Sequence, residues 1–426
     1  MSSRWVFFDL DGTLTRSEEG IWNCARYAAQ RMGFPQPDGE TLKQWIGPPL
    51  IWSFRNLLGM TEEQAVRAQE IYRERYTAVG KFENQVYPGV RGMLRALRAG
   101  GVHLGVVTGK PEGPTRDILE HFGLMKFVER ISCATDARAE KDHLIRSVLP
   151  EDAEEAWMVG DRRFDMEGGV QAGVRTIGAA WGYGTEEELR DAGAQYIARD
   201  AWAVAEIVCP GARRPEGAFL SMEGLDGSGK STQMEMLTRN LERFGFEVEH
   251  SREPGGTPIG EKIRELLLSR ENGEMTDVTE ALLYAAARAQ HVRERIRPAV
   301  AAGRVLLCDR FLDSSVAYQG GGRQLGVDRV LALNAEAVED TLPMVTIYLD
   351  LDHRTSLARR SAASELDRLE AEKEEFHARV EQGYHELISR NPDRYVVVDA
   401  RKDREEIARE ISEKVLERLL AAEEAG

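Results

Sequence analysis

Cysteine is scarce in this sequence, and the cysteines lie far apart from one another. The 426 residues include four cysteines, at positions 24, 133, 209 and 308, and no C-x-x-C pair occurs. Zinc sites and disulfide frameworks need cysteines that recur at short, regular spacings. The sequence therefore argues against both, and its cysteine usage suits a reducing cytosol.

Long apolar stretches are lacking as well. No run approaches the about 18 apolar residues that a transmembrane helix needs. The first residues, MSSRWVFFDLDG, carry charges where a secretory signal peptide would be apolar. We therefore predict an intracellular, cytoplasmic protein with no membrane partner.

Positive charge is the third deficit. The chain has 56 Lys and Arg against 72 Asp and Glu, a formal net charge of −16 and a pI of about 5.2. Such an acidic surface repels nucleic acid and anionic lipid. The phosphate-binding motifs described below are therefore predicted to serve small molecules.

Short apolar runs alternate with amphipathic helical segments along the whole chain. Continuous apolar runs that are each followed by a helix are typical of buried parallel strands. With a length of 426 residues, this pattern predicts two α/β domains. The expected strands are 5–10, 102–108, 157–160 and 176–180 in the first half, and 218–222, 305–308, 344–349 and 395–398 in the second.

A Pro/Gly-rich stretch, CPGARRPEG over residues 209–217, separates the two halves. We place the first domain at residues 1–209, a linker at 210–217 and the second domain at 218–426. Residues 17–86 contain no convincing strand and are expected to form a helical insertion after the first strand.

The second domain opens with a phosphate-binding motif. GLDGSGKS at residues 224–231 fits G-x-x-x-x-G-K-[ST], follows an apolar strand and opens a helix expected at 231–244. Glycine backbones let N–H groups converge on phosphate oxygens, and the helix N-terminus adds the positive end of its dipole. We predict that Lys230 holds the β- and γ-phosphates and that Ser231 binds Mg²⁺. The predicted cradle consists of Gly224, Leu225, Asp226, Gly227, Ser228, Gly229, Lys230, Ser231 and Thr232.

Four further motifs follow this P-loop: REPGGT at 252–257, LYAAAR at 283–288, DRF at 309–311 and AYQGGGR at 317–323. In this order and spacing they resemble the thymidylate kinases, over essentially all of residues 218–426. The resemblance implies a P-loop nucleoside-monophosphate kinase fold with a parallel sheet, and phosphorylation of dTMP to dTDP with ATP as donor. It also implies a homodimer that packs long helices together. The helical stretch 276–302 could form that interface, or it could be ordinary core.

The resemblance also implies roles for individual residues. Arg252 and Arg310 would clamp the phosphate of the acceptor nucleotide, since a guanidinium fork suits two oxygens. Tyr284 would stack on the thymine ring. Arg288 would donate to thymine O4, where cytosine carries a competing donor. The other assignments are Ser315 and Gln319 near the base, Tyr318 at the sugar 2′ position, and Asp226 at the 3′-hydroxyl.

Plainer interpretations stay open for some of these residues. Tyr284 could be helix core, and Arg252 or Arg323 could be a solvated loop charge. Asp309 ends a strand and could support Mg²⁺ through water or simply orient Arg310.

A mobile lid is expected at about residues 357–370. Phosphoryl transfer needs positive charge on the migrating group, and in this family a P-loop arginine or a lid arginine provides it. Because position 227 is glycine, the lid must do so here. The lid departs from the pattern of such bacterial members, because residues 361–364 occupy a stretch that is often richer in Arg and Gly. The candidates are Arg359, Arg360 and Arg368, of which we favour Arg360 and Arg368 without ranking them; each could instead belong to a salt-bridged helix surface.

The first domain carries a different set of motifs. Its first strand ends at FDLDGT, which places Asp9 and Asp11 two residues apart. Such a pair suits a phosphoaspartyl mechanism, because one carboxylate can attack phosphorus while its neighbour acts as acid and base. Three further segments stand near strand ends or helix starts: TGK at 108–110, Lys141, and GDRRFD at 160–165.

Together these four motifs resemble the haloacid dehalogenase-like phosphatases, over about residues 4–205. The resemblance implies a Rossmann-like fold with a helical cap, and a bound Mg²⁺. It makes Asp9 the nucleophile and Asp11 the general acid/base, with Thr108 and Lys141 on the phosphate. The implied metal ligands are Asp9, Asp161 and the backbone carbonyl of Asp11, with Asp165 behind them rather than among them.

The inserted helices, including WIGPPL at 45–50, resemble the cap of the phosphoglycolate-phosphatase-like branch, but the substrate that the cap selects is not evident from the sequence. The overall prediction is a bifunctional enzyme: a dTMP kinase fused to a Mg²⁺-dependent phosphatase of a small phosphomonoester. Hydrolysis of dTMP itself would create a futile cycle, so we expect another substrate, such as a damaged or non-standard nucleotide or phosphoglycolate. Two alternatives remain: a catalytically idle phosphatase-like domain with a regulatory or assembly role, and a kinase for a different monophosphate.

Overall fold

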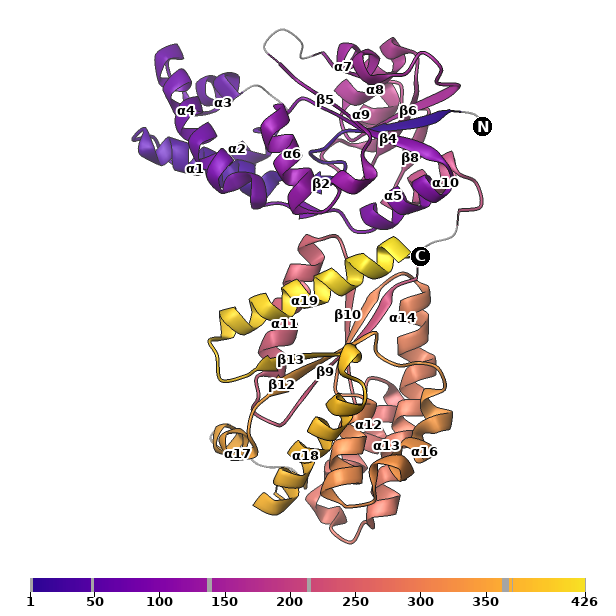
Figure 1. Cartoon of the computed structure of the whole chain (residues 1–426). Coiled ribbons are helices and arrows are strands. Elements are labelled where there is room, and N and C mark those ends of the chain that lie inside the picture. The colour runs from indigo at the N-terminus through magenta and orange to yellow at the C-terminus, as the bar shows by residue number, and fades with distance from the viewer. Residues whose placement is uncertain are drawn as a thin grey trace. The chain divides into compact units, whose positions relative to one another are not determined.

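The computed structural model describes residues 3–46, 50–135, 140–212, 216–361, 368–369 and 371–425. The chain forms two compact units that divide in the region of the predicted linker (Figure 1). That linker, 210–217, falls partly on residues 213–215, which lie outside the described residues. Among the helices of the described residues, none is long and apolar enough to cross a membrane.

The first unit is built on a six-stranded parallel sheet with the strand order β5-β4-β1-β6-β7-β8. The strands are β1 (Arg4–Phe8), β4 (Val102–Thr108), β5 (Arg130–Cys133), β6 (Glu155–Gly160), β7 (Arg175–Ala179) and β8 (Tyr196–Ala198). In β1, Val6 and Phe8 enter one core cluster and Trp5 and Phe7 the other, because successive side chains of a strand point to opposite faces. Both faces are therefore buried, as a parallel sheet requires.

Helices cover both faces of this sheet. The core that contains Val6 and Phe8 is closed by α5 (Val90–Ala99), α6 (Glu112–His121) and α10 (Ala201–Val208). The core on the other face includes Leu144 and Ile145 of α7 (Lys141–Val148) and Ala172 of α8 (Arg163–Ala172). Two short helices complete the layers, η2 (Met125–Phe127) and α9 (Glu186–Asp191).

The insertion between β1 and β4 forms a helical cap with its own apolar core. It contains α1 (Glu18–Arg31), α2 (Gly39–Lys43), α3 (Leu50–Leu58), α4 (Glu62–Ala78) and η1 (Gly80–Phe82). The helical insertion is thus confirmed, with one correction at its end. Gln85–Val86 form β3, which pairs antiparallel with β2 (Thr15–Arg16) and ties the two ends of the insertion together. Residues 47–49 of the WIGPPL segment lie outside the described residues.

The second unit has a five-stranded parallel sheet with the order β10-β11-β9-β12-β13. Its strands are β9 (Ala218–Gly224), β10 (Val248–Arg252), β11 (Val305–Asp309), β12 (Val345–Asp350) and β13 (Tyr395–Asp399). The prediction of two α/β domains with parallel sheets is confirmed. The central strands, β1 in one sheet and β9 in the other, each end at a predicted site, as ligand sites of open α/β sheets do.

Helices again form a layer on each face. One face of the second sheet is closed by α11 (Lys230–Arg243) and α19 (Arg404–Ala425), which lie together in Figure 1. The opposite face packs against α14 (Arg297–Ala301), α16 (Val327–Val338) and α18 (Glu374–Arg390), together with the π-helices η4 (Val292–Ile296) and η5 (Val316–Gly322). The remaining helices are α12 (Pro258–Leu268), η3 (Arg270–Asn272), α13 (Asp277–His291), α15 (Leu312–Ser315), α17 (His353–Ser361) and η6 (Pro392–Arg394).

Candidate active sites

A cavity of about 420 Å³ opens at the carboxyl end of β9. The P-loop supplies much of its wall, and neighbouring segments supply the remainder. It is lined by Asp226, Gly227, Gly229, Lys230, Ser231, Thr232, Arg252, Glu253, Arg264, Asp309 and Arg310. The sequence therefore brings basic groups and glycine backbone together at a helix N-terminus, which is suited to a polyphosphate.

Lys230 is held within the P-loop itself. Its Nζ donates to the carbonyl oxygens of Gly224 and Leu225, at 3.2 and 3.1 Å. Burial, with help from the nearby Arg310 charge, lowers the pKa of Lys230 below its ordinary value. Gly224 has φ 140°, and a Cβ there would lie 2.8 Å from the carbonyl oxygen of Leu349, so the loop needs glycine at this position.

A second, smaller cavity of about 120 Å³ has a mixed polar and aromatic wall. Seven of its lining residues were predicted substrate contacts: Asp226, Tyr284, Arg288, Arg310, Ser315, Tyr318 and Gln319. Four residues line both cavities: Asp226, Glu253, Arg264 and Arg310. Two ligand-sized spaces thus meet at a shared wall of charged groups, as a reaction between two phosphorylated substrates requires.

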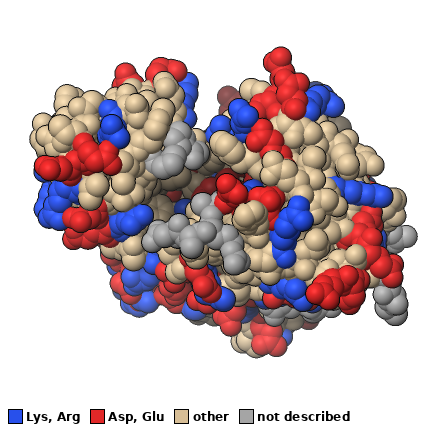
Figure 2. Space-filling view, turned by 90° about the horizontal axis from the view of Figure 1, so that it is seen from above, with Lys and Arg blue, Asp and Glu red and all other residues tan. Residues whose placement is uncertain are grey.

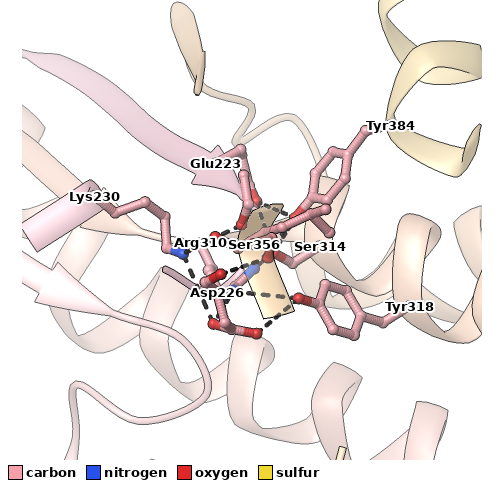
Figure 3. A network of polar contacts seen from close by, with 10 residues as sticks. Glu223, Asp226, Lys230, Arg310, Ser314, Tyr318, Ser356 and Tyr384 are labelled. Atoms are coloured by element: carbon pink, nitrogen blue, oxygen red, sulfur yellow. Dashed lines mark hydrogen bonds and ion pairs between the residues drawn. The ribbon is translucent and has the colours of Figure 1, made fainter. Parts of the chain in front are cut away.

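Arg310 is the centre of this shared wall (Figure 3). Its Nη2 donates to Asp226 Oδ1 at 2.5 Å and to the Tyr318 hydroxyl at 3.3 Å. Tyr318 in turn donates to Asp226 Oδ2 at 3.0 Å. Burial alone would raise the pKa of Asp226, but the charges of Arg310 and Lys230 outweigh it and hold that pKa well below its usual range. Asp226 is therefore a carboxylate at neutral pH.

Arg288 is fixed by four protein acceptors. Its Nε donates to Glu253 Oε2 at 2.8 Å, and its Nη2 donates to the Phe311 carbonyl and to Ser315 Oγ, each at 3.1 Å. Nη1 donates to Asn334 Oδ1. The Arg288 side chain is 1% exposed, so these partners hold its guanidinium at the wall of the smaller cavity in one orientation.

Other predicted contacts are divided between the two cavities. Arg252 and Asp309 line the larger cavity and not the smaller one. Arg252 Nη2 pairs with Glu261 Oε2 at 3.0 Å and its side chain is 55% exposed. Gln319 lines the smaller cavity and donates to Glu280 Oε1 at 2.9 Å.

The predicted lid is described in part, because residues 362–367 and 370 and the side chain of Arg360 lie outside the described residues. Arg359 donates to the carbonyl of Ala400 at 3.2 Å. Arg368 pairs with the buried Glu280 at 2.6 Å and donates from Nε to the Leu267 carbonyl at 2.9 Å. Arg323 joins the same Glu280 at 3.2 Å, so it is not a solvated loop charge. Neither Arg359 nor Arg368 lines the two cavities.

Sequence reasoning missed Glu253 and Arg264. Glu253 pairs with Arg288 and also lies 2.8 Å from His291 Nδ1, with both partners buried. Arg264 donates from Nη1 to the Pro254 carbonyl at 2.9 Å and lines both cavities. The REPGGT motif contains Glu253, but the motif alone does not reveal an inward-facing acid, and Arg264 lies seven residues beyond that motif on α12.

At the carboxyl end of β1, two acids contact one lysine. Lys141 Nζ lies 2.6 Å from Asp9 Oδ1 and 2.7 Å from Asp165 Oδ1, and donates to the Val107 carbonyl at 3.0 Å. Burial raises the pKa of Asp9 to about 7 against the opposing charge of Lys141. Burial lowers the pKa of Lys141, but Asp165 and Asp9 outweigh it and raise that pKa above its ordinary value.

The same acids could hold a divalent cation. One carboxylate oxygen each from Asp9, Asp161 and Asp165 lies within 4.8 Å of the other two. Asp161 is fully buried, and burial with the neighbouring acids Asp165 and Asp9 raises its pKa well above the ordinary value. A cluster of buried carboxylates with this mutual repulsion fits Mg²⁺, whose charge would relieve it. Asp165 belongs to this cluster, whereas the sequence placed it behind the ligands.

Glycine lets the backbone approach Asp161. Gly12 has φ 88°, and a Cβ there would lie 2.2 Å from Asp161 Oδ2. Asp161 also accepts from Thr13 Oγ1 at 3.1 Å and from the Tyr183 backbone N–H at 2.8 Å. The FDLDGT motif thus positions Asp161 as well as presenting its own carboxylates.

The second carboxylate of the motif faces the cap. Asp11 Oδ2 lies 3.0 Å from Lys110 Nζ, and Lys110 donates to the hydroxyl of Tyr76 on the cap helix α4 at 2.6 Å. Thr108 Oγ1 accepts from the Lys110 backbone N–H at 3.2 Å. The predicted groups therefore lie near one another: Lys141 contacts Asp9, and a carboxylate oxygen of Asp161 lies within 4.8 Å of one of Asp9. Asp11 and Thr108 are both joined to Lys110.

The surface charge is mixed in sign. In Figure 2, Lys and Arg atoms lie among Asp and Glu atoms over the face in view, and acidic atoms line part of the hollow at its centre. No broad basic area covers the face in view.

Two protein families match this chain. Thymidylate kinase matches residues 222–411, and haloacid dehalogenase-like hydrolase matches residues 6–179. A thymidylate kinase of Limosilactobacillus fermentum is 50% identical over 187 residues, which cover 43% of this chain and 87% of that protein. A thymidylate kinase of Halothermothrix orenii is 50% identical over 202 residues, which cover 47% of this chain and 96% of that protein.

Solved structures similar to this chain include two hydrolase-type proteins. One, described as a predicted phosphatase from Clostridium acetobutylicum, is 35% identical, with 49% of this chain and 99% of that chain covered and a TM-score of 0.45. The other is a haloacid dehalogenase-like hydrolase from Streptococcus pneumoniae. It is 30% identical, with 48% of this chain and 97% of that chain covered and a TM-score of 0.45.

Proposed function

Because the chain belongs to the thymidylate kinase family through its C-terminal half, we propose that this half transfers the γ-phosphoryl group of ATP to dTMP. The observation that supports the proposal most is the pair of cavities that meet at Asp226 and Arg310. In the reaction, an oxygen of the dTMP phosphate bonds to the γ-phosphorus as the bond to the β,γ-bridging oxygen breaks. The products are dTDP and ADP.

The residues of the larger cavity would bind and orient ATP. Lys230 and the P-loop amides would hold the β- and γ-phosphates, and Ser231 would be the protein ligand of Mg²⁺. When bound, Mg²⁺ neutralises charge on the phosphate oxygens. Arg310, at the shared wall, would hold the acceptor phosphate in line with the γ-phosphate. Of the two favoured lid arginines, Arg360 would add positive charge to the migrating group, because Arg368 pairs with the buried Glu280 and lines neither cavity.

The smaller cavity would bind the thymine nucleoside. Tyr284 would stack on the base, Arg288 would donate to thymine O4, and Ser315 and Gln319 would add polar contacts. Tyr318 would crowd a 2′-hydroxyl while Asp226 accepts from the 3′-hydroxyl. Asp226 suits that role because it stays ionised, but Arg310 and Tyr318 also share its oxygens.

The acceptor is tested by competition. The purified protein, with ATP and Mg²⁺, is given equal amounts of dTMP, dUMP, UMP and dCMP, and the diphosphates are separated by chromatography. We expect dTDP to dominate, with dCDP and UDP at trace levels. Preferential formation of another diphosphate would overturn the assignment of dTMP.

We further propose that the N-terminal half hydrolyses a small phosphomonoester through a phosphoaspartyl intermediate on Asp9. The support is the contact of Lys141 with Asp9, inside a group of acids that fits Mg²⁺. Asp9 would attack phosphorus while Lys141 and Thr108 hold the phosphoryl oxygens. Asp11 would give a proton to the leaving alcohol and then take one from the water that cleaves the acyl phosphate. Mg²⁺, held by Asp9, Asp161 and the Asp11 carbonyl, supplies charge neutralisation when bound.

A panel of phosphomonoesters tests this second activity. Inorganic phosphate release is measured in Mg²⁺ for dTMP, phosphoglycolate and non-standard nucleotides, with an Asp9→Asn variant in parallel. We expect turnover of at least one ester other than dTMP, and none by the variant. If no ester is turned over, the alternative of an idle regulatory or assembly domain is supported instead.

A further inference from the structure

The Arg310 guanidinium is anchored at both ends. Asp226 and Tyr318 accept from Nη2, and two hydroxyls accept from Nη1, Ser314 Oγ at 3.1 Å and Tyr384 OH at 3.3 Å. Arg310 also has φ 68°, the left-handed conformation that a residue with a Cβ rarely adopts. Its position therefore depends on support from its surroundings.

Glu223 supports Arg310 indirectly, through the residues that contact it. It is fully buried at the end of β9, directly before the P-loop, and lines neither cavity. Its Oε1 accepts from the Phe311 backbone N–H at 2.7 Å, immediately after the left-handed residue. Its Oε2 accepts from Ser314 Oγ at 2.6 Å and from the Tyr384 hydroxyl at 2.9 Å. The convergence of these side chains is visible in Figure 3.

The direction of these hydrogen bonds matters. A hydroxyl has one proton, so a serine or tyrosine that donates to Glu223 presents a lone pair to Arg310. A neutral carboxyl or an amide in place of the carboxylate would donate to a hydroxyl, whose own proton would then turn toward the guanidinium. We propose that Glu223 is a positioning residue of the kinase, whose carboxylate orients Ser314 and Tyr384 so that they hold Arg310 against the acceptor phosphate. The inference rests on the proposed kinase function.

The charge state of Glu223 is sensitive to pH. Burial, followed by the nearby Asp313 carboxylate, raises the pKa of Glu223 to about 7 against the opposing effects of Ser314, Arg310 and Tyr384. Asp313 itself pairs with Arg394 at 2.8 Å and accepts from Tyr395 OH at 2.9 Å. The titratable or charged groups near Glu223 are Arg310, Asp313, Tyr384, Lys230, Tyr348, Tyr395 and Cys308. The carboxylate is thus present above about pH 7 and is lost as the pH falls below it.

The test compares the wild-type protein with Glu223→Gln in dTDP formation. At pH 8 we expect kcat to fall roughly 10- to 100-fold, because the reacting groups are misplaced. The KM for ATP should stay within about twofold, since Glu223 does not line the ATP cavity. The ratio of wild-type to variant kcat should then fall about tenfold between pH 8 and pH 6, since protonated Glu223 resembles glutamine. Ionisation of the substrates cancels in this ratio.

Tyrosine variants provide a matched pair. Tyr348 and Tyr384 are both buried, with ring centroids 5.0 Å apart. The Tyr384 hydroxyl donates to Glu223 and accepts from Arg310. The Tyr348 hydroxyl has no hydrogen-bond partner among the described residues. Tyr384→Phe should lower kcat about 3- to 10-fold, and Tyr348→Phe should leave it within about twofold.

Two results would overturn the proposal: an unchanged kcat in Glu223→Gln, or a ratio that does not change with pH. A variant that only loses folded protein would lower the active fraction equally at both pH values, and thermal unfolding measured in the same buffers detects it. If the wild type forms no dTDP, the proposed acceptor is wrong, and the same comparison is then made with whichever monophosphate it phosphorylates.

Discussion

Arg288 and Glu253 form an ion pair that is almost completely withdrawn from solvent. Arg288 Nε lies 2.8 Å from Glu253 Oε2, and the two side chains are 1% and 3% exposed. Ion pairs at this depth are stabilised by geometry and by further hydrogen bonds rather than by charge alone. Here the second oxygen of Glu253 contacts His291, and three further guanidinium N–H groups go to Asn334, Phe311 and Ser315. One of the five guanidinium N–H groups is left for a ligand. The arginine is therefore a rigid part of the cavity wall.

Arg288→Ala is expected to affect stability and selectivity together. Loss of the guanidinium leaves the buried Glu253 without its main charge partner, so we expect the free energy of unfolding to fall by about 3–5 kcal/mol. Denaturant titration checks this value. In the protein that remains folded, the ratio of kcat/KM for dTMP to that for dCMP should fall toward one. A variant that retains full preference for dTMP would show that Arg288 serves only the fold.

Arg368→Ala is expected to weaken dTMP binding more than ATP binding. Arg368 joins Glu280 to the Leu267 carbonyl, and its neighbours Leu268 and Leu369 line the smaller cavity. We therefore expect KM for dTMP to rise about 3- to 10-fold, with KM for ATP nearly constant. Arg354→Ala is the control, because Arg354 is 79% exposed and pairs with the half-exposed Glu374. An equal rise in both KM values would contradict a role at the dTMP cavity.

Asp226→Asn is expected to destabilise the protein in a pH-dependent way. The charges of Arg310 and Lys230 hold the pKa of Asp226 below its ordinary value despite burial. Its carboxylate therefore contributes stability above the unfolded-state pKa of about 3.9, and this contribution is lost as the pH falls below that value. Urea unfolding should show a clear deficit of the variant at pH 7 that shrinks toward pH 3. A deficit of the same size at both pH values would mean that packing, not charge, is responsible.

Lys141→Met is expected to abolish phosphomonoester hydrolysis while sparing the kinase. The lysine neutralises Asp9 and Asp165, which would otherwise repel each other and the substrate phosphate. We expect the rate of phosphate release to fall at least about 100-fold. Arg146→Met, an exposed change on the same helix, serves as the control. Parallel loss in both variants would point to unfolding of α7 rather than to loss of a phosphate contact.

The central strands could be predicted from sequence because they are buried on both faces. Val102–Thr108 was predicted to the residue, and the other expected strands differ from the observed ones by one or two residues at one or both ends. Three strands of the two large sheets were missed: Arg130–Cys133, Tyr196–Ala198 and Val248–Arg252. All three lie at sheet edges, where one side of the strand is unpaired and polar residues are tolerated. Their sequences therefore lack the continuous apolar run.

The residues of the candidate sites also fall into two groups, those that the sequence identifies and those that it does not. Residues in compact motifs, such as Lys230 and Asp9, could be identified because the chemistry requires them next to glycines or at a strand end. Glu223, Glu253 and Arg264 could not be assigned a role, because their importance comes from contacts with segments distant in the sequence. Asp165 was predicted to stand behind the metal ligands; it lies among the clustered acids, and its role relative to the ion stays a prediction.

The most direct test of the account is formation of dTDP from ATP and dTMP by the wild-type protein, a Lys230→Ala variant and an Asp9→Asn variant. We expect dTDP from the wild type and from Asp9→Asn at similar rates, and none from Lys230→Ala. That result would establish a kinase that depends on its P-loop and is independent of the N-terminal acids. Absence of dTDP from the wild type, or its loss in Asp9→Asn, would contradict the account.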